Sequence, residues 1–205
     1  MIISDIPREF RLAPTGLHMA RLFSVVDLGH QSTEWAGKVK IMHKVDLTWE
    51  LHGNDDSGNP LTTDAGKPLI VYKRYTVSLG DQSTLRKDLE SWSGKKMTAE
   101  DRKNFDVRNL LGKFCMVNIT HSDDGKFANI SAISPVPSAL RDSKPEGINP
   151  TKSFWLKEFK QEEYDALSNY HKEKIEKSSE WRGQQEREKN APKLADDDGF
   201  GPPPF

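Results

Sequence analysis

Basic and aromatic side chains alternate with apolar ones along two segments of this chain, residues 38–51 and 69–79. In an extended strand, every second side chain points to the same face. The side chains that such faces would present are Lys38, Lys40, Lys44, Tyr72 and Arg74. Lysine and arginine neutralise phosphates, and an exposed aromatic ring stacks on a base without reading its identity. The pattern therefore predicts a surface that binds a nucleic-acid strand without sequence preference.

Three further residues could extend this surface. Trp35 precedes the first segment, and Lys126 and Phe127 directly follow a Ser-Asp-Asp-Gly turn. In the alternative interpretation, the lysines form an ordinary solvated face and the aromatic rings close the ends of a barrel. Trp49 and Tyr75 share the parity of the apolar residues, so we expect both to pack inside.

Patterns typical of catalysis or metal binding are absent from the sequence. The six histidines lack metal-ligand spacing, and the acidic pairs Asp55-Asp56 and Asp123-Asp124 lie in turn-like segments. No phosphate-binding loop, nucleophile elbow or dinucleotide fingerprint occurs. Cys115 falls on an alternating apolar segment, which favours a small core residue over a nucleophile. We predict a protein that is not an enzyme and uses no metal or cofactor.

The chain ends in an acidic run followed by Gly-Phe-Gly-Pro-Pro-Pro-Phe. Three successive prolines prevent a helix and favour an extended form, which can offer charge and an aromatic ring to a pocket of another protein. The residues expected to bind such a partner are Asp196, Asp197, Asp198, Phe200, Pro204 and Phe205. An ordinary frayed terminus is the alternative. This acidic tip resembles the tails of bacterial and phage single-stranded DNA-binding proteins, which recruit replication and repair partners.

Composition limits the class of protein. With 205 residues, the chain fits one domain with appendages. Mean hydropathy is -0.73, and no apolar run approaches the roughly 20 residues of a membrane helix. No secretory signal is visible, and a single cysteine excludes an intrachain disulfide, so a cytoplasmic setting is expected. Net charge is only -1, so a nucleic-acid surface must come from local clustering of basic residues.

Five segments have the composition and alternation of β-strands: residues 17–26, 38–51, 69–79, 114–120 and 127–133. A turn through Gly37 is expected after the first. The inward residues of the second are predicted to be Val39, Ile41, Val45, Leu47, Trp49 and Leu51, and those of the third Leu69, Val71, Tyr75, Val77 and Leu79. Lys73 interrupts the inward set of the third segment, which predicts a β-bulge or a strand end there.

Short helices separate the third and fourth strands. Ser83 can cap a helix through Trp92, residues 98–101 have a capping-box pattern, and residues 106–111 form a third short element. Three strands, a helical insert and two more strands is the element order of an OB-fold. We therefore predict a mainly β protein: a five-stranded OB-fold Greek-key barrel with a helical insert between strands 3 and 4, a C-terminal helix and a disordered acidic tail.

The predicted domain organisation has five parts. Residues 1–15 form an N-terminal arm, 16–137 the OB-fold domain, and 138–153 a linker rich in Pro, Gly and Ser. Residues 154–181 have a helical period with interspersed Lys and Glu, which predicts one helix. Residues 182–205 are expected to be a disordered acidic tail.

Two strings carry a resemblance that covers roughly residues 10–140. The string Leu-Arg-Lys-Asp-Leu-Glu-Ser-Trp ends at Trp92, and Gly-Lys-Phe-Ala-Asn-Ile-Ser-Ala-Ile-Ser-Pro-Val-Pro ends at Pro137. They resemble a family of bacteriophage OB-fold proteins, often described as single-stranded DNA-binding proteins. The resemblance implies a phage protein of replication or recombination that coats single-stranded DNA in the cytoplasm of the infected bacterial host. The tail departs from the usual bacterial form by inserting Gly-Phe-Gly-Pro-Pro before Pro-Phe.

The leading hypothesis is a single-stranded DNA-binding protein that recruits phage or host replication and recombination proteins through its tail. No membrane partner is expected, and a homo-oligomer is possible. The alternative is an interaction or regulatory protein whose barrel binds another protein, such as a host factor, because the near-neutral net charge and the charged C-terminal region suit that role.

Overall fold

Two long paired strands form the centre of this mainly β structure. The computed structural model describes residues 11–35 and 37–183, so most of the predicted N-terminal arm and nearly all of the predicted tail lie outside it. Within the described part, the strands are β1 (Gly16–Trp35), β2 (Lys38–His52), β3 (Ile70–Thr76), β4 (Phe114–His121), β5 (Ala128–Ser134) and β6 (Lys152–Phe154).

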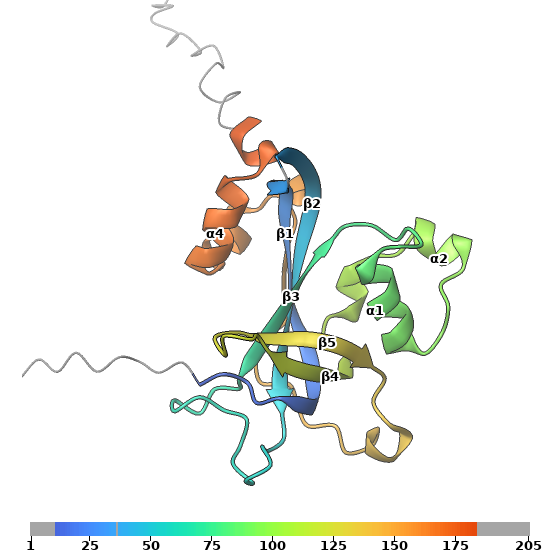
Figure 1. Ribbon diagram of the computed structural model, residues 1–205, viewed down its shortest axis with the longest axis vertical. Helices are drawn as coiled ribbons and strands as arrows, with labels where there is room; N and C mark the ends of the chain where they lie inside the picture. Colours follow the sequence, from blue (N-terminus) through green and yellow to red (C-terminus); the bar gives the residue numbers. More distant parts are fainter. Residues whose placement is uncertain (1–10, 36, 184–205) are drawn as a thin grey trace, which may run out of the picture.

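The sheet follows the path β3-β2-β1-β4-β5, and each neighbouring pair is antiparallel. Strand β1 is long enough to pair with β4 near its start and with β6, in parallel, near its middle. At the ends of the path, β3 and β5 lie against each other without ladder hydrogen bonds, so the sheet curls into a barrel-like layer (Figure 1). Three helical elements follow β3 along the chain and lie on one side of this layer: α1 (Thr84–Ser93), α2 (Ala99–Lys103) and η1 (Val107–Leu110).

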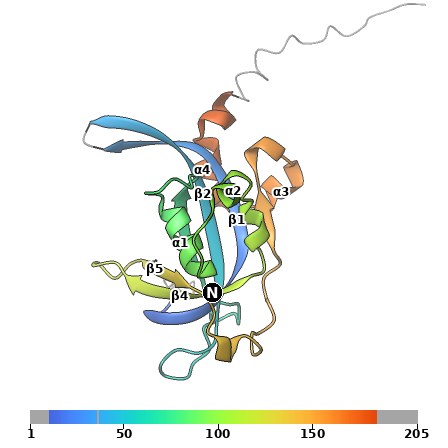
Figure 2. The same cartoon turned by 90° about the vertical axis from the view of Figure 1, so that its right-hand side faces the viewer.

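The far ends of β1 and β2 form a projecting hairpin, which we call the arm and define as residues 30–35 and 37–42 (Figure 2). The sequence predicted that the first strand ends at Val26 and that a turn follows; this was wrong. Gly29, with φ of 69°, makes a bulge that lets β1 continue to Trp35. A Cβ atom at Gly29 would lie 2.6 Å from Leu156 Cδ1, so both conformation and packing require glycine.

The main core lies inside the barrel-like layer. The second-strand residues Val45, Leu47, Trp49 and Leu51 are buried there, as predicted. Cys115 and Tyr75 are also buried, which confirms that both pack inside. Burial raises the pKa of the Cys115 thiol, so it stays protonated and unreactive.

Three expectations about strand faces were wrong. Val39 and Ile41 are 64% and 63% exposed, because the arm carries them beyond the core that buries Val45. Val77 is exposed because β3 ends at Thr76. Lys73 lies in a ladder without any register shift, and its amine meets a carboxylate oxygen of Asp88 at 2.8 Å, so the strand neither bulges nor ends there.

The helical elements between β3 and β4 begin where the sequence predicted. The side chain of Ser83 caps α1 (Thr84–Ser93), and Thr98 and Asp101 form a capping box at α2 (Ala99–Lys103). A 3-10 turn, η1 (Val107–Leu110), follows. Leu85, Leu89 and Trp92 are buried against the main core, at the spacing of one helix face.

The C-terminal region differs most from expectation. Residues 138–153 are not simply a linker, since they include η2 (Ser138–Leu140) and the start of β6. Residues 154–181 do not form one helix but include η3 (Leu156–Glu158), α3 (Gln161–Asp165) and α4 (Asn169–Glu176). Part of this region forms a second core, in which Phe154, Tyr164 and Ile175 pack on Val26 and Leu28 of β1.

This C-terminal region covers the outer face of β2, which the sequence left open to solvent. Asp46, Thr48 and Glu50 are all buried. Glu50 accepts hydrogen bonds from Arg21 Nε at 2.6 Å and from the backbone N–H of Asn149 at 2.7 Å. Burial alone would raise the pKa of Glu50, but these hydrogen bonds lower it to about 2, so the carboxylate stays charged.

Candidate nucleic-acid interface

The predicted basic residues of β2 lie in two different environments. Lys38 and Lys40 are exposed on the arm and form no ion pair with another described residue. Lys44 lies closer to the barrel, half-buried, and its Nζ donates a hydrogen bond to Thr76 Oγ1 at 2.8 Å. Burial and the nearby Arg74 lower the pKa of Lys44. Of these three lysines, only Lys38 and Lys40 can neutralise a phosphate without first giving up a contact with another described residue.

The guanidinium group of Arg74 is largely occupied by contacts within the protein. Its guanidinium forms a two-pronged pair with the buried carboxylate of Asp46, with both N···O distances at 2.8 Å. A third hydrogen bond, also 2.8 Å, reaches the hydroxyl of Tyr170 on α4. Burial alone would raise the pKa of Asp46, but the bonds from Arg74 and His171 keep it below the ordinary value. The prediction that Arg74 contacts phosphate is therefore weakened, because Asp46 already neutralises its charge.

Tyr72 is exposed on β3, as predicted, but it is not alone. Its side chain is 50% exposed, and its ring centroid lies 6.0 Å from that of Tyr170, which is 41% exposed. The two hydroxyl oxygens are 3.5 Å apart. A hydrogen bond with Tyr170 and partial burial raise the pKa of Tyr72 to about 12, so the phenol is neutral at physiological pH. The pair offers ring surface without negative charge to a stacking base.

The hairpin between β4 and β5 carries two more predicted residues. Phe127 is 62% exposed, just before β5 rather than within it. The turn is fixed by the Ser122 hydroxyl, which accepts from the Phe127 N–H at 3.1 Å, and by Gly125, with φ of 68°. Lys126 is exposed, and its Nζ lies 3.7 Å from an Asp124 oxygen. A solvated ring beside a weakly paired cation is consistent with either a binding role or a simple turn.

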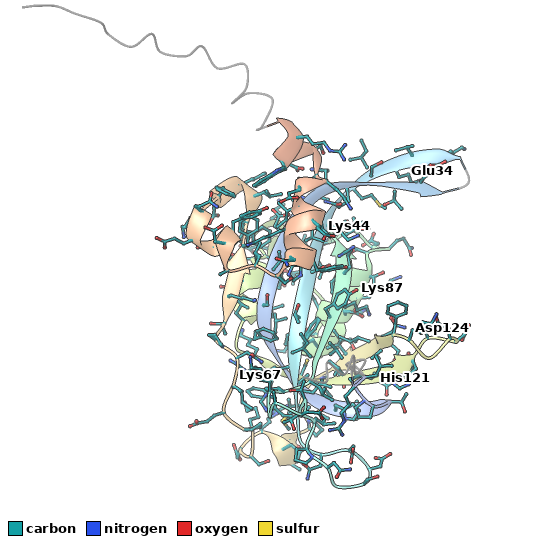
Figure 3. All side chains as sticks on the ribbon, turned by 90° about the vertical axis from the view of Figure 1, so that its left-hand side faces the viewer. Glu34, Lys44, Lys67, Lys87, His121 and Asp124 are labelled. Carbon is teal, nitrogen blue, oxygen red and sulfur yellow. The ribbon has the colours of Figure 1, made fainter. Side chains whose placement is uncertain are left out.

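The arm and the β4–β5 hairpin project on the same side of the molecule. Figure 3 shows Glu34 on the arm and Asp124 on the other hairpin, with the side of the sheet that carries α4 facing the viewer. Trp35 lies opposite Lys38 in the ladder, at the end of the arm; its side chain is not among those that the structure describes. The predicted tail residues 196–205 also lie outside the described part.

Two contributors were missed by sequence reasoning. Tyr170 and Lys174 are one helical turn apart on α4, and Lys174 Nζ lies 5.6 Å from the centre of the Tyr170 ring. The missed signal was the spacing of Tyr170 and Lys174, four residues apart, which places a ring and a cation on one helix face. Residues 154–181 were predicted to form one helix with no assigned contact, so neither residue was considered as a ligand contact.

The described residues give little support for a metal site or for a membrane-spanning helix. No group of three or more His, Cys, Asp or Glu side chains in residues 11–183 is placed to hold a metal ion. His43 and His30 stack on each other, but each has a carboxylate partner: Asp27, at 2.6 Å from His43 Nε2, and Glu180. None of the helices in the described ranges has the length and apolar character needed to cross a membrane.

Neither a protein-family model nor a curated protein matches this sequence. The functional argument therefore depends on the residues of this chain.

Proposed function

We propose that this protein binds single-stranded DNA without sequence specificity, and that its barrel-like layer is an OB-fold. The observation that carries the proposal is the exposed Tyr72 on the outer face of β3, together with two hairpins that project on one side of the molecule and bear exposed Lys38, Lys40 and Phe127 (Figure 3). Basic side chains along such a surface bind the backbone, and aromatic rings stack on successive bases whatever their sequence.

The OB-fold assignment is supported by strand order and by the place of the helices. Strand β1 pairs with both β2 and β4, and α1 lies between β3 and β4 in sequence. In OB-folds, ligands bind on the face of strands 2 and 3, next to the loops that join strands 1 to 2 and 4 to 5. In this chain, Tyr72 lies on β3, and the hairpins that join β1 to β2 and β4 to β5 project on one side of the molecule (Figure 3), which supports this assignment.

The wider role follows from the same proposal. A non-enzymatic protein of this kind would coat single strands during phage replication or recombination, in the cytoplasm of an infected bacterium. Its acidic C-terminal residues would recruit phage or host partner proteins.

Fluorescence-anisotropy titration of a labelled poly-dT strand tests the proposal, at low and physiological salt and with duplex DNA as control. We expect salt-sensitive binding that strongly favours the single strand. The double variant Lys38→Glu/Lys40→Glu should weaken binding at least tenfold, whereas Lys67→Glu, on the loop between β2 and β3, should not (Figure 3). Absence of strand binding at low salt would overturn the proposal.

A second function is favoured by one observation. Val39 and Ile41 are neighbours on one face of the arm, and both are mostly exposed. An exposed apolar pair on a projecting hairpin suits contact with another protein, such as a host factor. Binding of a partner that is lost in Val39→Ser/Ile41→Ser, with no strand binding by the wild type, would favour this alternative.

A further inference from the structure

An aromatic pair joins two parts of the chain that are far apart in sequence. Tyr72 lies on β3 and Tyr170 on α4, 98 residues later, and their ring centroids are 6.0 Å apart. Both rings remain substantially exposed, although each has close neighbours. Tyrosines that serve only to attach α4 to the sheet would be expected to bury their rings, as Tyr164 of α3 does in the second core.

The Tyr170 ring is held in place by groups that a nucleic acid does not need to displace. Arg74 donates to its hydroxyl while remaining paired with the buried Asp46, and the guanidinium carbon lies 5.8 Å from the ring centre. The Nε2 atom of His171, the next residue on α4, lies 3.6 Å from Asp46 Oδ2. The position of Tyr170 is therefore set before any ligand arrives.

Lysine side chains lie on the same side of the protein as this pair. Lys174 lies over the Tyr170 ring, and Lys44 is on the same outer face of β2 as Asp46. Asp46 is buried, so its charge is matched internally by Arg74 instead of facing a ligand. A ring flanked by an ammonium group suits a base and its phosphate, which need stacking and neutralisation respectively.

We propose that α4 is part of the strand-binding surface: Tyr170 stacks on a base together with Tyr72, and Lys174 neutralises the adjacent phosphate. Arg74 and Asp46 act as positioning residues that hold Tyr170. The inference rests on the proposed single-strand binding and extends it, because it makes the C-terminal helical region a component of the site and not a spacer before the tail.

Two lysines of α4 provide a matched test. The Nζ atom of Lys174 lies 5.6 Å from the centre of the exposed Tyr170 ring. The Nζ atom of Lys172 lies 5.5 Å from the centre of the buried Tyr164 ring. In titrations of the full chain with labelled poly-dT, Lys174→Gln should weaken binding several-fold and flatten its salt dependence, whereas Lys172→Gln should change neither. Tyr170→Ala should weaken binding about tenfold, and Tyr170→Phe should weaken it less, because it keeps the ring but loses the hydroxyl that Arg74 holds.

Photo-crosslinking distinguishes direct contact with the strand from an indirect effect of a substitution on folding. A strand with 5-iodouracil in place of thymine, irradiated in the complex, should crosslink to the peptides that contain Tyr170 and Tyr72. Thermal unfolding of each variant shows whether the fold is kept. Wild-type binding with an unaffected Tyr170→Ala variant and no crosslink at Tyr170 overturns this inference alone. Failure of the wild type to bind any strand overturns both it and the proposed function.

Discussion

The two halves of β2 share one sequence pattern but have opposite environments. Residues 38–42 lie on the arm, where both apolar members of the alternation, Val39 and Ile41, are exposed. Residues 45–52 are buried on both faces, because the main core covers one face and the C-terminal region covers the other. Alternation therefore shows that a strand forms, but the elements that pack on the strand decide which of its faces is buried.

The largest loss of stability is expected from a substitution where the C-terminal region covers β2. Glu50→Ala should lower the free energy of unfolding by about 3–5 kcal/mol, because it leaves the buried Arg21 unpaired and removes the acceptor for the Ile148 and Asn149 N–H groups. Urea denaturation followed by circular dichroism measures this. A loss below about 1 kcal/mol would mean that residues 148–149 do not hold the outer face of β2.

The same carboxylate should make stability depend on pH. The pKa of Glu50 is about 2 in the folded protein, against an ordinary value of 4.5. Its contribution, on the order of 3 kcal/mol, is complete above about pH 5 and is lost as pH falls towards 2. Denaturation midpoints between pH 7 and 2.5 should show this decline, and Glu50→Gln should reduce it. An unchanged profile in Glu50→Gln would assign the acid sensitivity to other groups.

A matched pair of truncations on one face of β2 compares its two halves directly. Leu47→Ala should cost about 2–5 kcal/mol, because it leaves a cavity in the main core. Ile41→Ala, six residues earlier and of the same parity, should change stability by less than about 0.5 kcal/mol. Equal losses in chemical denaturation would show that the arm is packed in solution, for example against a second copy.

A smaller loss of stability is expected from a substitution where β3 meets α4. Arg74→Ala should cost about 2 kcal/mol, since Asp46 would lose its main partner but keep His171. Lys40→Ala is the control on the arm and should leave stability unchanged within about 0.5 kcal/mol. If Arg74→Ala were as stable as the wild type, the Asp46 pair would not be what positions α4.

Local signals in the sequence were sufficient for several elements. The caps at Ser83 and Thr98 fix where α1 and α2 begin, because a side-chain oxygen satisfies backbone N–H groups within three residues. The apolar parity of Leu47, Trp49 and Leu51 identified core residues correctly. Both features depend on neighbours along the chain, which a single sequence displays.

Contacts between segments that are far apart in the sequence could not be predicted from such local patterns. The period in residues 154–181 was interpreted as one helix, but Phe154 joins a parallel strand pair with β1 and Ser168 caps a separate helix. The candidate site shows the same limit: Tyr72 could be identified from strand parity, whereas its neighbour Tyr170 could not. Their proximity depends on how the C-terminal region folds back over 98 residues.

The sequence by itself determined the mainly β class, the start of the helices after β3 and the exposed Tyr72, because strand alternation and capping are local. Only the tertiary structure decided that Arg74 is paired with a buried carboxylate, that Val39 and Ile41 face solvent, and that α4 reaches the candidate surface. These features depend on which segments cover which faces. That choice is made by burying Phe154, Tyr164 and Ile175 in a second core, which no local pattern specifies.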